Sequence, residues 1–414
     1  MNFGVFAWIL LGLYLALQGF EAAITRLNLA FLRSRRGEVP EAARGFIDPE
    51  TLSKAQDYLA ANTRHKLVAM AFNALVLVGF VYSGLLPAYG NWISSFRLPF
   101  VAEGLLFFLL LSLAEAFIGL PFDIAHEFGT EKRFGFSRMT PGLFAADFLK
   151  SLILSAFLVS ALAGGALFLV KLLPGSWWIA AWVFYFAFTL LVSWLAPMVI
   201  MPLFNKFEPL KDEELAARAK ALLERAGIRV EGLYQMDASK RSGHTNAYFT
   251  GLGKTKRIVL FDTLLSKLDH DEILAVLAHE AGHWKKKHVF KSLIAMGAVS
   301  LAVFYAVFAL LGVHVPARVF GIADASFFTE LFLLGFAGGI LGYIAGPIAA
   351  FFSRKNEREA DAYSKELTGN GKALASSLWK LSRDNLGNLH PHPLYVAVHY
   401  SHPPTAERAK LLED

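Results

Sequence analysis

Long uncharged stretches dominate the hydrophobic pattern of this chain. A run of about 20 apolar residues is long enough to cross a bilayer as a helix. Runs of this length recur along the sequence and predict seven transmembrane helices. No basic residue precedes the first run, as one would in a secretory signal, so we expect it to be retained as a membrane helix. The predicted spans are Val5–Leu29, Leu67–Pro87, Leu98–Leu120, Ser151–Val170, Trp177–Leu203, Ser292–Val315 and Leu331–Phe352.

The composition agrees with a membrane protein. Of the 414 residues, 55% are hydrophobic and 18% are charged, and the mean hydropathy is +0.44. Soluble domains contain roughly 25% charged residues, so we expect the lipid bilayer to be the main environment of this chain. The chain has no cysteine, which excludes disulfides and thiolate ligands. Any bound metal must therefore be held by histidine and carboxylate side chains.

The distribution of basic residues predicts the orientation. Loops rich in Lys and Arg face the cytoplasm. Such residues gather in the first and third loops, in the segment 205–291 and after Phe352, whereas the alternate loops contain few. We therefore expect an outward N-terminus, with 205–291 and the C-terminal segment in the cytoplasm. This pattern explains most of the net charge of +6, and we expect no nucleic-acid partner.

The segment between the fifth and sixth spans predicts a small α+β unit. Lys211–Ala226 has the pattern of an amphipathic helix and Ile228–Met236 that of a strand. Asn246–Thr250 and Arg257–Phe261 predict a hairpin around Gly251-Leu252-Gly253. The chain thus divides into membrane helices 1–5 at 1–204, a cytoplasmic insertion at 205–291, membrane helices 6–7 at 292–352, and a cytoplasmic C-terminal segment at 353–414.

The sequence His279-Glu280-Ala281-Gly282-His283 follows this hairpin. It is an H-E-x-x-H motif in a segment of helical pattern, which Asp269 or Asp271 would cap. Residues four apart lie on one face of a helix, so the two imidazoles can hold one Zn²⁺. Glu280 would then accept a proton from metal-bound water, as expected for a zinc peptidase.

A catalytic zinc requires a third protein ligand, and Glu357 is the best candidate. Asp361 lies one helical turn further and is expected to accept the far N–H of a ligating histidine. Glu359 is expected to point elsewhere and to be solvated. Two predicted membrane helices separate His283 from Glu357, so both lie on the same side of the bilayer.

These features together resemble the Ste24-type CAAX prenyl proteases, which are integral membrane zinc metallopeptidases of the M48 group. The likeness covers nearly the whole chain and includes four motifs in order. The motifs are Lys240-Arg241-Ser242 with Asn246-Ala247-Tyr248-Phe249, His279 to Trp284, Ser353-Arg354 with Glu357 and Ala360-Asp361, and Tyr400-Ser401-His402-Pro403-Pro404 followed by Glu407-Arg408.

The resemblance implies a mostly α polytopic fold, in which seven helices surround a large water-filled chamber with one zinc ion at its cytoplasmic end. It implies a zinc endopeptidase that removes a C-terminal tripeptide from a prenylated protein or peptide. His402 would stabilise the oxyanion and Arg408 would brace the site. The segment that aligns the substrate would consist of Asn246, Ala247, Tyr248 and Phe249.

Several alternatives stay open at this stage. We expect a monomeric protein of a bacterial inner membrane. In a bacterium without protein prenylation, such a protein would require a different substrate. An M48 quality-control protease of membrane proteins is the first alternative function, although such proteases have fewer membrane helices. A non-enzymatic transporter or receptor with a fortuitous motif is the second. His288 is expected at the membrane interface, and the pattern assigns no role to His244, Glu103 or Glu115.

Overall fold

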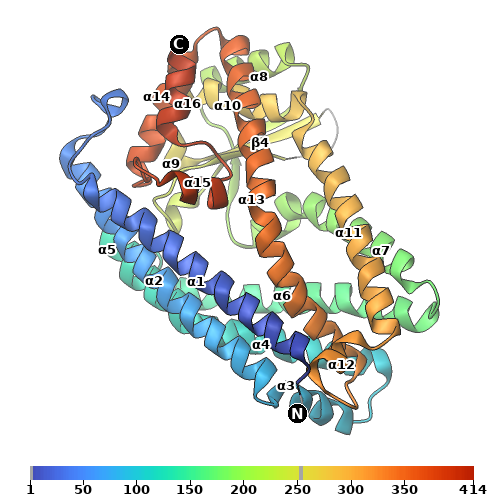
Figure 1. Cartoon of the computed structure of the whole chain (residues 1–414). Helices are drawn as coiled ribbons and strands as arrows, with labels where there is room; N and C mark the ends of the chain where they lie inside the picture. Colours follow the sequence, from blue (N-terminus) through green and yellow to red (C-terminus); the bar gives the residue numbers. More distant parts are fainter. Residues whose placement is uncertain (1–2, 251–254) are drawn as a thin grey trace.

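The computed structural model of the protein describes residues 3–250 and 255–414. The Gly251-Leu252-Gly253 turn predicted for the hairpin lies outside them. Long helices form one part of the molecule, and a smaller unit with a short sheet lies at one end of these helices (Figure 1). The C-terminal helices, which are far along the chain from the strands, complete this smaller unit.

Seven helical segments within the described residues are long and apolar enough to span a membrane, as predicted. They comprise α1, α2, α4 with the π-helical turn and the short α5 that follow it, α6, α7 with the two short helical turns that follow it, α11 and α13. The helices of this part are α1 (Val5–Ser34), α2 (Pro49–Tyr82), α3 (Leu85–Ser95), α4 (Phe100–Ala125), α5 (Lys132–Phe134), α6 (Pro141–Leu172), α7 (Trp177–Leu195), α11 (His288–Gly312), α12 (Val315–Phe320) and α13 (Phe327–Thr368).

Two of these helices continue well beyond their apolar spans. The helix α2 begins at Pro49 rather than Leu67, because the Asp48 side chain caps it by accepting a hydrogen bond from the Thr51 N–H at 2.7 Å. The helix α13 continues past Phe352 to Thr368, where Gly369 ends it with a φ of +67°. Hydropathy detects the apolar span but not the ends of the helix. A polar sequence with good helix propensity can continue the same helix beyond the apolar span. The polar end of α13 thereby enters the smaller unit.

The smaller unit combines a four-stranded sheet with helices. Its strand order is β1-β2-β4-β3, with β2 and β4 parallel and the other pairs antiparallel. The predicted hairpin strands pair as β3 and β4, and β3 is an edge strand. The elements are β1 (Phe207–Pro209), α8 (Glu213–Arg225), β2 (Arg229–Met236), β3 (Ala247–Thr250), β4 (Thr255–Phe261), α9 (Asp262–Leu265), α10 (His270–Lys285), α14 (Gly371–Asp384), α15 (Pro393–His399) and α16 (Thr405–Glu413).

A compact apolar core holds α10 in place. Leu223 of α8, Ile258 of β4 and Leu277 of α10 are completely buried and belong to one cluster. Burying each such side chain stabilises the fold by about 1.5–3 kcal/mol, so several of them fix the rotation of the helix. With its apolar residues committed to this core, α10 presents its histidines on another face.

A buried carboxylate connects the C-terminal segment to the membrane helices. Glu21 of α1 lies 2.6 Å from the Lys66 ammonium of α2 and 3.0 Å from the His399 ring of α15. It also accepts a hydrogen bond from the Tyr343 hydroxyl of α13 at 2.5 Å. Carboxylates inside membrane segments are normally paired in this way. The contacts tie the segment just before His402 to three membrane helices.

Candidate metal centre

The helix α10 places two imidazoles side by side. It begins with a capping box, in which the Asp269 side chain accepts from the Glu272 N–H and the Glu272 side chain accepts from the Asp269 N–H. Of the two predicted caps, Asp269 is the one used. The helix then continues through the motif, and the Nε2 atoms of His279 and His283 lie 3.2 Å apart.

The helix α13 brings Glu357 to these imidazoles. In the chain, two membrane spans separate Glu357 from the two histidines. Its approach is close because Gly282, between the two histidines, has no side chain. A Cβ atom at Gly282 would lie 2.9 Å from the Cα atom of Ala360. Ala360 is also completely buried at this crossing. The small residues therefore allow the two helix backbones to approach closely enough for a short carboxylate to reach both rings.

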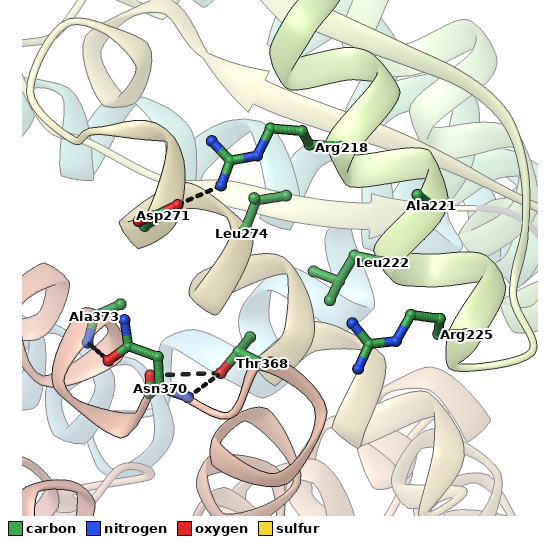
Figure 2. Close-up of a pocket in the computed structure, with 9 residues that line it drawn as sticks. All are labelled: Arg218, Ala221, Leu222, Arg225, Asp271, Leu274, Thr368, Asn370 and Ala373. Carbon is green, nitrogen blue, oxygen red and sulfur yellow. Dashed lines mark hydrogen bonds and ion pairs between the residues drawn. The ribbon is translucent and has the colours of Figure 1, made fainter.

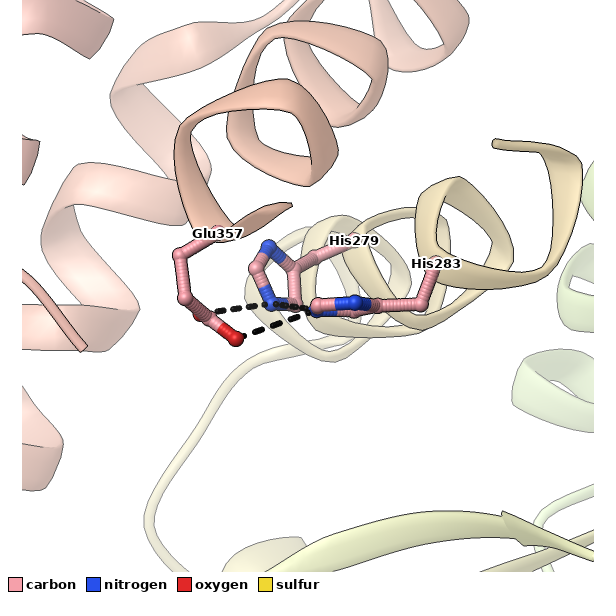
Figure 3. Close-up of side chains that lie close together, drawn as sticks. All are labelled: His279, His283 and Glu357. Atoms are coloured by element: carbon pink, nitrogen blue, oxygen red, sulfur yellow. Dashed lines mark hydrogen bonds and ion pairs between the residues drawn. The ribbon is translucent and has the colours of Figure 1, made fainter. Parts of the chain in front are cut away.

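The three side chains form a group that fits a tetrahedral metal ion (Figure 3). Glu357 Oε2 lies 3.4 Å from His279 Nε2, and Glu357 Oε1 lies 3.2 Å from His283 Nε2. Ligand atoms placed about 2.0–2.1 Å from a tetrahedral zinc are separated by about 3.3 Å, which agrees with these distances. Glu357 Oε2 is moreover buried without a hydrogen-bond partner among the described residues. The Arg408 Nη1 atom lies 3.6 Å from this oxygen, beyond hydrogen-bond distance, and a metal ion would contact the oxygen directly.

Asp361 and Arg408 support His279 from behind. The Nδ1 atom of His279 lies 2.8 Å from Asp361 Oδ1, on the side of the ring opposite the shared group. The Arg408 guanidinium donates two hydrogen bonds to the Asp361 carboxylate, at 2.8 and 2.6 Å. Burial favours the neutral form of His279, but the Asp361 and Glu357 carboxylates outweigh this effect and raise the pKa of His279 to about 9. Both supporting residues, Asp361 and Arg408, are buried.

Glu280 and His402 lie at the same centre in different surroundings. Burial raises the pKa of the Glu280 carboxyl above its ordinary value. The Nε2 atom of His402 lies 3.4 Å from Glu357 Oε1, and its side chain is 60% exposed. His402 is therefore accessible to a molecule that binds beside the three-residue group. Arg354 positions this segment by donating hydrogen bonds to the carbonyl oxygens of Val396 and Tyr400 at 3.0 and 2.7 Å.

The predicted substrate segment occupies the exposed edge of the sheet. Ala247, Tyr248 and Phe249 belong to β3, which pairs with β4 on one side only within the described residues. Asn246 directly precedes this strand, and its carbonyl oxygen accepts a hydrogen bond from the Phe261 N–H at 3.1 Å. An edge strand has free backbone groups along its outer side, and an extended peptide can pair with them.

One residue near the centre differs from expectation, and a second makes a contact that was not expected. Glu359 is not a solvated charge, because its Oε2 atom lies 3.2 Å from His288 Nε2. His288 is buried, and its Nδ1 atom lies 3.0 Å from His283 Nδ1. The spacing of His288 from His283 does not match a helical face, because the chain turns between them at Lys287. No signal in the sequence alone connects Glu359 with this histidine.

Other polar residues lie away from the centre. His244 stacks on Phe136 and lies 3.1 Å from the buried Glu131 carboxylate. Glu103 accepts a hydrogen bond from the Ser94 hydroxyl. A cleft of about 380 Å³ opens between α8, the start of α10 and the turn from α13 to α14, where Arg218 pairs with Asp271 (Figure 2). The residues that line it do not include His279, His283 or Glu357, so this cleft is separate from the candidate centre.

Comparisons with known proteins cover the full length of the chain. Residues 28–206 match the family described as CAAX prenyl protease N-terminal, five membrane helices, and residues 209–414 match peptidase family M48. The chain is 32% identical to CAAX prenyl protease 1 of Saccharomyces cerevisiae, over 98% of this chain and 94% of the relative. It is 30% identical to a Bacillus subtilis protein named Uncharacterized metalloprotease YhfN, over 92% of each chain. The crystal structure of S. mikatae Ste24p superposes with a TM-score of 0.89 at 32% identity and covers 98% of both chains.

Proposed function

The chain belongs to peptidase family M48, in its CAAX prenyl protease branch, and is an integral membrane metallopeptidase; from this premise we propose that it cleaves peptide bonds at one zinc ion held by His279, His283 and Glu357. The observation that carries the proposal is the group of three ligand atoms within 4.8 Å of one another, with a buried carboxylate oxygen that lacks a hydrogen bond. This oxygen and the two Nε2 atoms match the donors that zinc prefers.

Each of the surrounding residues has a distinct role in this proposal. A zinc ion bound there would lower the pKa of a water molecule and polarise the scissile carbonyl. Glu280 accepts the proton of that water and passes it to the leaving amine. Its raised pKa supports this role, because a carboxylate whose pKa is raised is a stronger base than an ordinary one. His402 donates a hydrogen bond to the developing oxyanion, and its exposed ring supports this assignment.

The supporting residues keep the ligands in one orientation. Asp361 orients His279 through Nδ1 and thereby leaves Nε2 facing the shared group. Arg408 braces Asp361 with two hydrogen bonds. The substrate backbone pairs with the outer side of β3, the strand that follows Asn246 and contains Ala247, Tyr248 and Phe249. This pairing lays an extended peptide across the face of the centre.

We infer that the substrate is the C-terminal part of a prenylated protein or peptide, taken up by a monomer from the space between the membrane helices. The likeness to CAAX prenyl protease 1 over almost the whole chain supports this substrate class. The basic loops support a cytoplasmic centre. The proposed location is a bacterial inner membrane, where an unmodified membrane peptide is the alternative substrate.

One experiment tests both the metal and the substrate. Metal content is measured for the purified chain, and cleavage is followed for a farnesylated C-terminal peptide and for the same peptide without the lipid, each with and without chelator. We expect about one zinc per chain and chelator-sensitive cleavage that is faster for the farnesylated peptide. Cleavage that persists after complete removal of the metal would refute the zinc mechanism. Equal rates for the two peptides would refute the prenylated substrate while leaving the peptidase intact.

A further inference from the structure

His288 lies against the back of a proposed ligand because of a sharp turn in the backbone. Lys287, between α10 and α11, has a φ of +58°, in the left-handed region that side chains other than glycine rarely adopt. The turn ends α10 and starts α11 at His288, whose ring then meets that of His283 with centroids 5.1 Å apart. His288 is only 3% exposed, so its ring nitrogens need partners within the protein.

The nitrogen and oxygen atoms on this side of His283 form a continuous chain. His283 Nδ1 lies 3.0 Å from His288 Nδ1, and His288 Nε2 lies 3.2 Å from Glu359 Oε2. A neutral imidazole has one N–H donor and one acceptor nitrogen. If His283 binds a metal through Nε2, its hydrogen is on Nδ1 and is donated to His288 Nδ1. The hydrogen of His288 is then on Nε2 and is donated to the Glu359 carboxylate. One assignment of hydrogens therefore satisfies every contact.

We propose that His288 and Glu359 are positioning residues that hold His283 with Nε2 directed at the metal. The inference rests on the proposed function, in which His283 is a ligand. It also completes the pattern seen at the other imidazole. Asp361 contacts His279 Nδ1 directly, whereas the Glu359 carboxylate reaches His283 through an intervening ring. Both ligands then have a carboxylate behind them: Asp361 contacts His279 directly, and Glu359 acts on His283 through His288. Such a carboxylate raises the basicity of the ligand and sets its tautomer.

A purely structural role for His288 leads to a different expectation. A ring that only fills space at the start of α11 could be replaced by phenylalanine without changing the affinity for zinc. A ring that accepts a hydrogen bond from His283 could not. Asparagine separates the two roles, because its side-chain oxygen can accept that hydrogen bond although its amide is too short to span the distance to Glu359.

The test uses the purified full-length chain and four variants: His288→Phe, His288→Asn, Glu359→Ala and Glu366→Ala. The last is the matched control, since Glu366 is an exposed residue of the same helix and its replacement removes the same charge. Zinc affinity is measured by competition with a chelator, and the absorption spectrum of the Co²⁺-substituted chain reports the ligand geometry. Neither measurement depends on turnover.

We expect His288→Phe to weaken zinc binding about 10–100-fold, the range for residues that orient a ligand, and to change the Co²⁺ spectrum. His288→Asn should recover part of the affinity, Glu359→Ala should lose less than His288→Phe, and Glu366→Ala should match the original chain. If His288→Phe fails to fold, Glu359→Ala decides the matter, because the Glu359 side chain is 37% exposed and its loss leaves no cavity.

Two outcomes would overturn this inference and leave the proposed function intact. One is an original chain that binds zinc while His288→Phe and Glu359→Ala bind it equally well. The other is a loss of affinity that is the same for His288→Phe and His288→Asn, which would indicate packing rather than hydrogen bonding. An original chain that binds no zinc at its three proposed ligands would instead refute the proposed function, and the positioning role with it.

Discussion

The glycine face of the membrane half of α13 and the Ala360 face of its polar half pack differently although they belong to one helix. In the membrane half, a Cβ atom added at Gly335, Gly338 or Gly342 would meet no heavy atom within 4 Å. In the polar half, Ala360 is completely buried and lies against Gly282 of α10 so closely that a single methyl group would not fit. Other residues of the membrane half, among them Leu333 and Ile340, are buried, so the contrast concerns these two faces of the helix.

The difference shows which part of the helix needs a close partner. Within a bilayer, a helix satisfies its own backbone hydrogen bonds and can leave much of its surface without protein contacts. Leu341 and Ile348 are accordingly 68% and 61% exposed in the protein. The polar half has to bring Glu357 within about 3.4 Å of two imidazoles on another helix. Such a distance requires close packing, because an ångström of misplacement separates a metal site from an ordinary ion pair.

The largest expected effects concern two carboxylates at the packed end. We expect Glu280→Gln to lower kcat about 10²–10⁴-fold while zinc content stays unchanged, because only the base is removed. Glu357→Ala should lose the metal as well, because a ligand is removed. Metal analysis and peptide cleavage of the two purified variants check this contrast. Full activity of Glu280→Gln would exclude Glu280 as the base.

The affinity of the metal centre for zinc should depend on pH. Because the pKa of His279 is about 9, its ring carries a proton at neutral pH until a metal displaces it. Raising the pH from 7 to 9 leaves only about half of the rings protonated and should increase the apparent affinity roughly 50-fold. Chelator competition across this range, corrected for the chelator's own protonation, gives the measurement. An affinity that is independent of pH would show that the ring is neutral before binding.

Gly282→Ala sharpens the comparison between the two halves. The new methyl group would overlap Ala360 of α13, so we expect a loss of about 1–3 kcal/mol in the free energy of unfolding and weaker zinc binding. Denaturant unfolding of the detergent-solubilised chain and chelator competition measure the two effects. Unchanged zinc affinity would mean that α13 can shift without moving Glu357 from its partners.

Gly338→Ala is the matched change in the membrane half, and the smallest expected effect. The added methyl group meets open space, and alanine is the better helix former, so stability should change by less than about 1 kcal/mol and zinc binding should not change. The same two measurements apply. A destabilisation as large as that of Gly282→Ala would contradict the view that the glycine face of the membrane half needs no close partner.

Much of the architecture could be predicted from the sequence. Apolar runs of membrane length identify all seven spans, because their signal lies within about 20 consecutive residues. The pairing of His279 with His283 follows from helical geometry, and the even number of intervening spans brings Glu357 to the same side. The edge position of β3 was harder to predict, since strand order depends on contacts between distant segments.

By itself the sequence determined features that depend on neighbouring residues or on composition. These are the membrane spans, the helix that carries His279 and His283, and the types of metal ligand available in a chain without cysteine. The tertiary structure alone decided how α10 and α13 cross at Gly282, how Glu21 holds the C-terminal segment, and how Lys287 turns His288 onto His283. Those contacts join residues that no periodicity relates, because they arise where separate helices pack against one another in three dimensions.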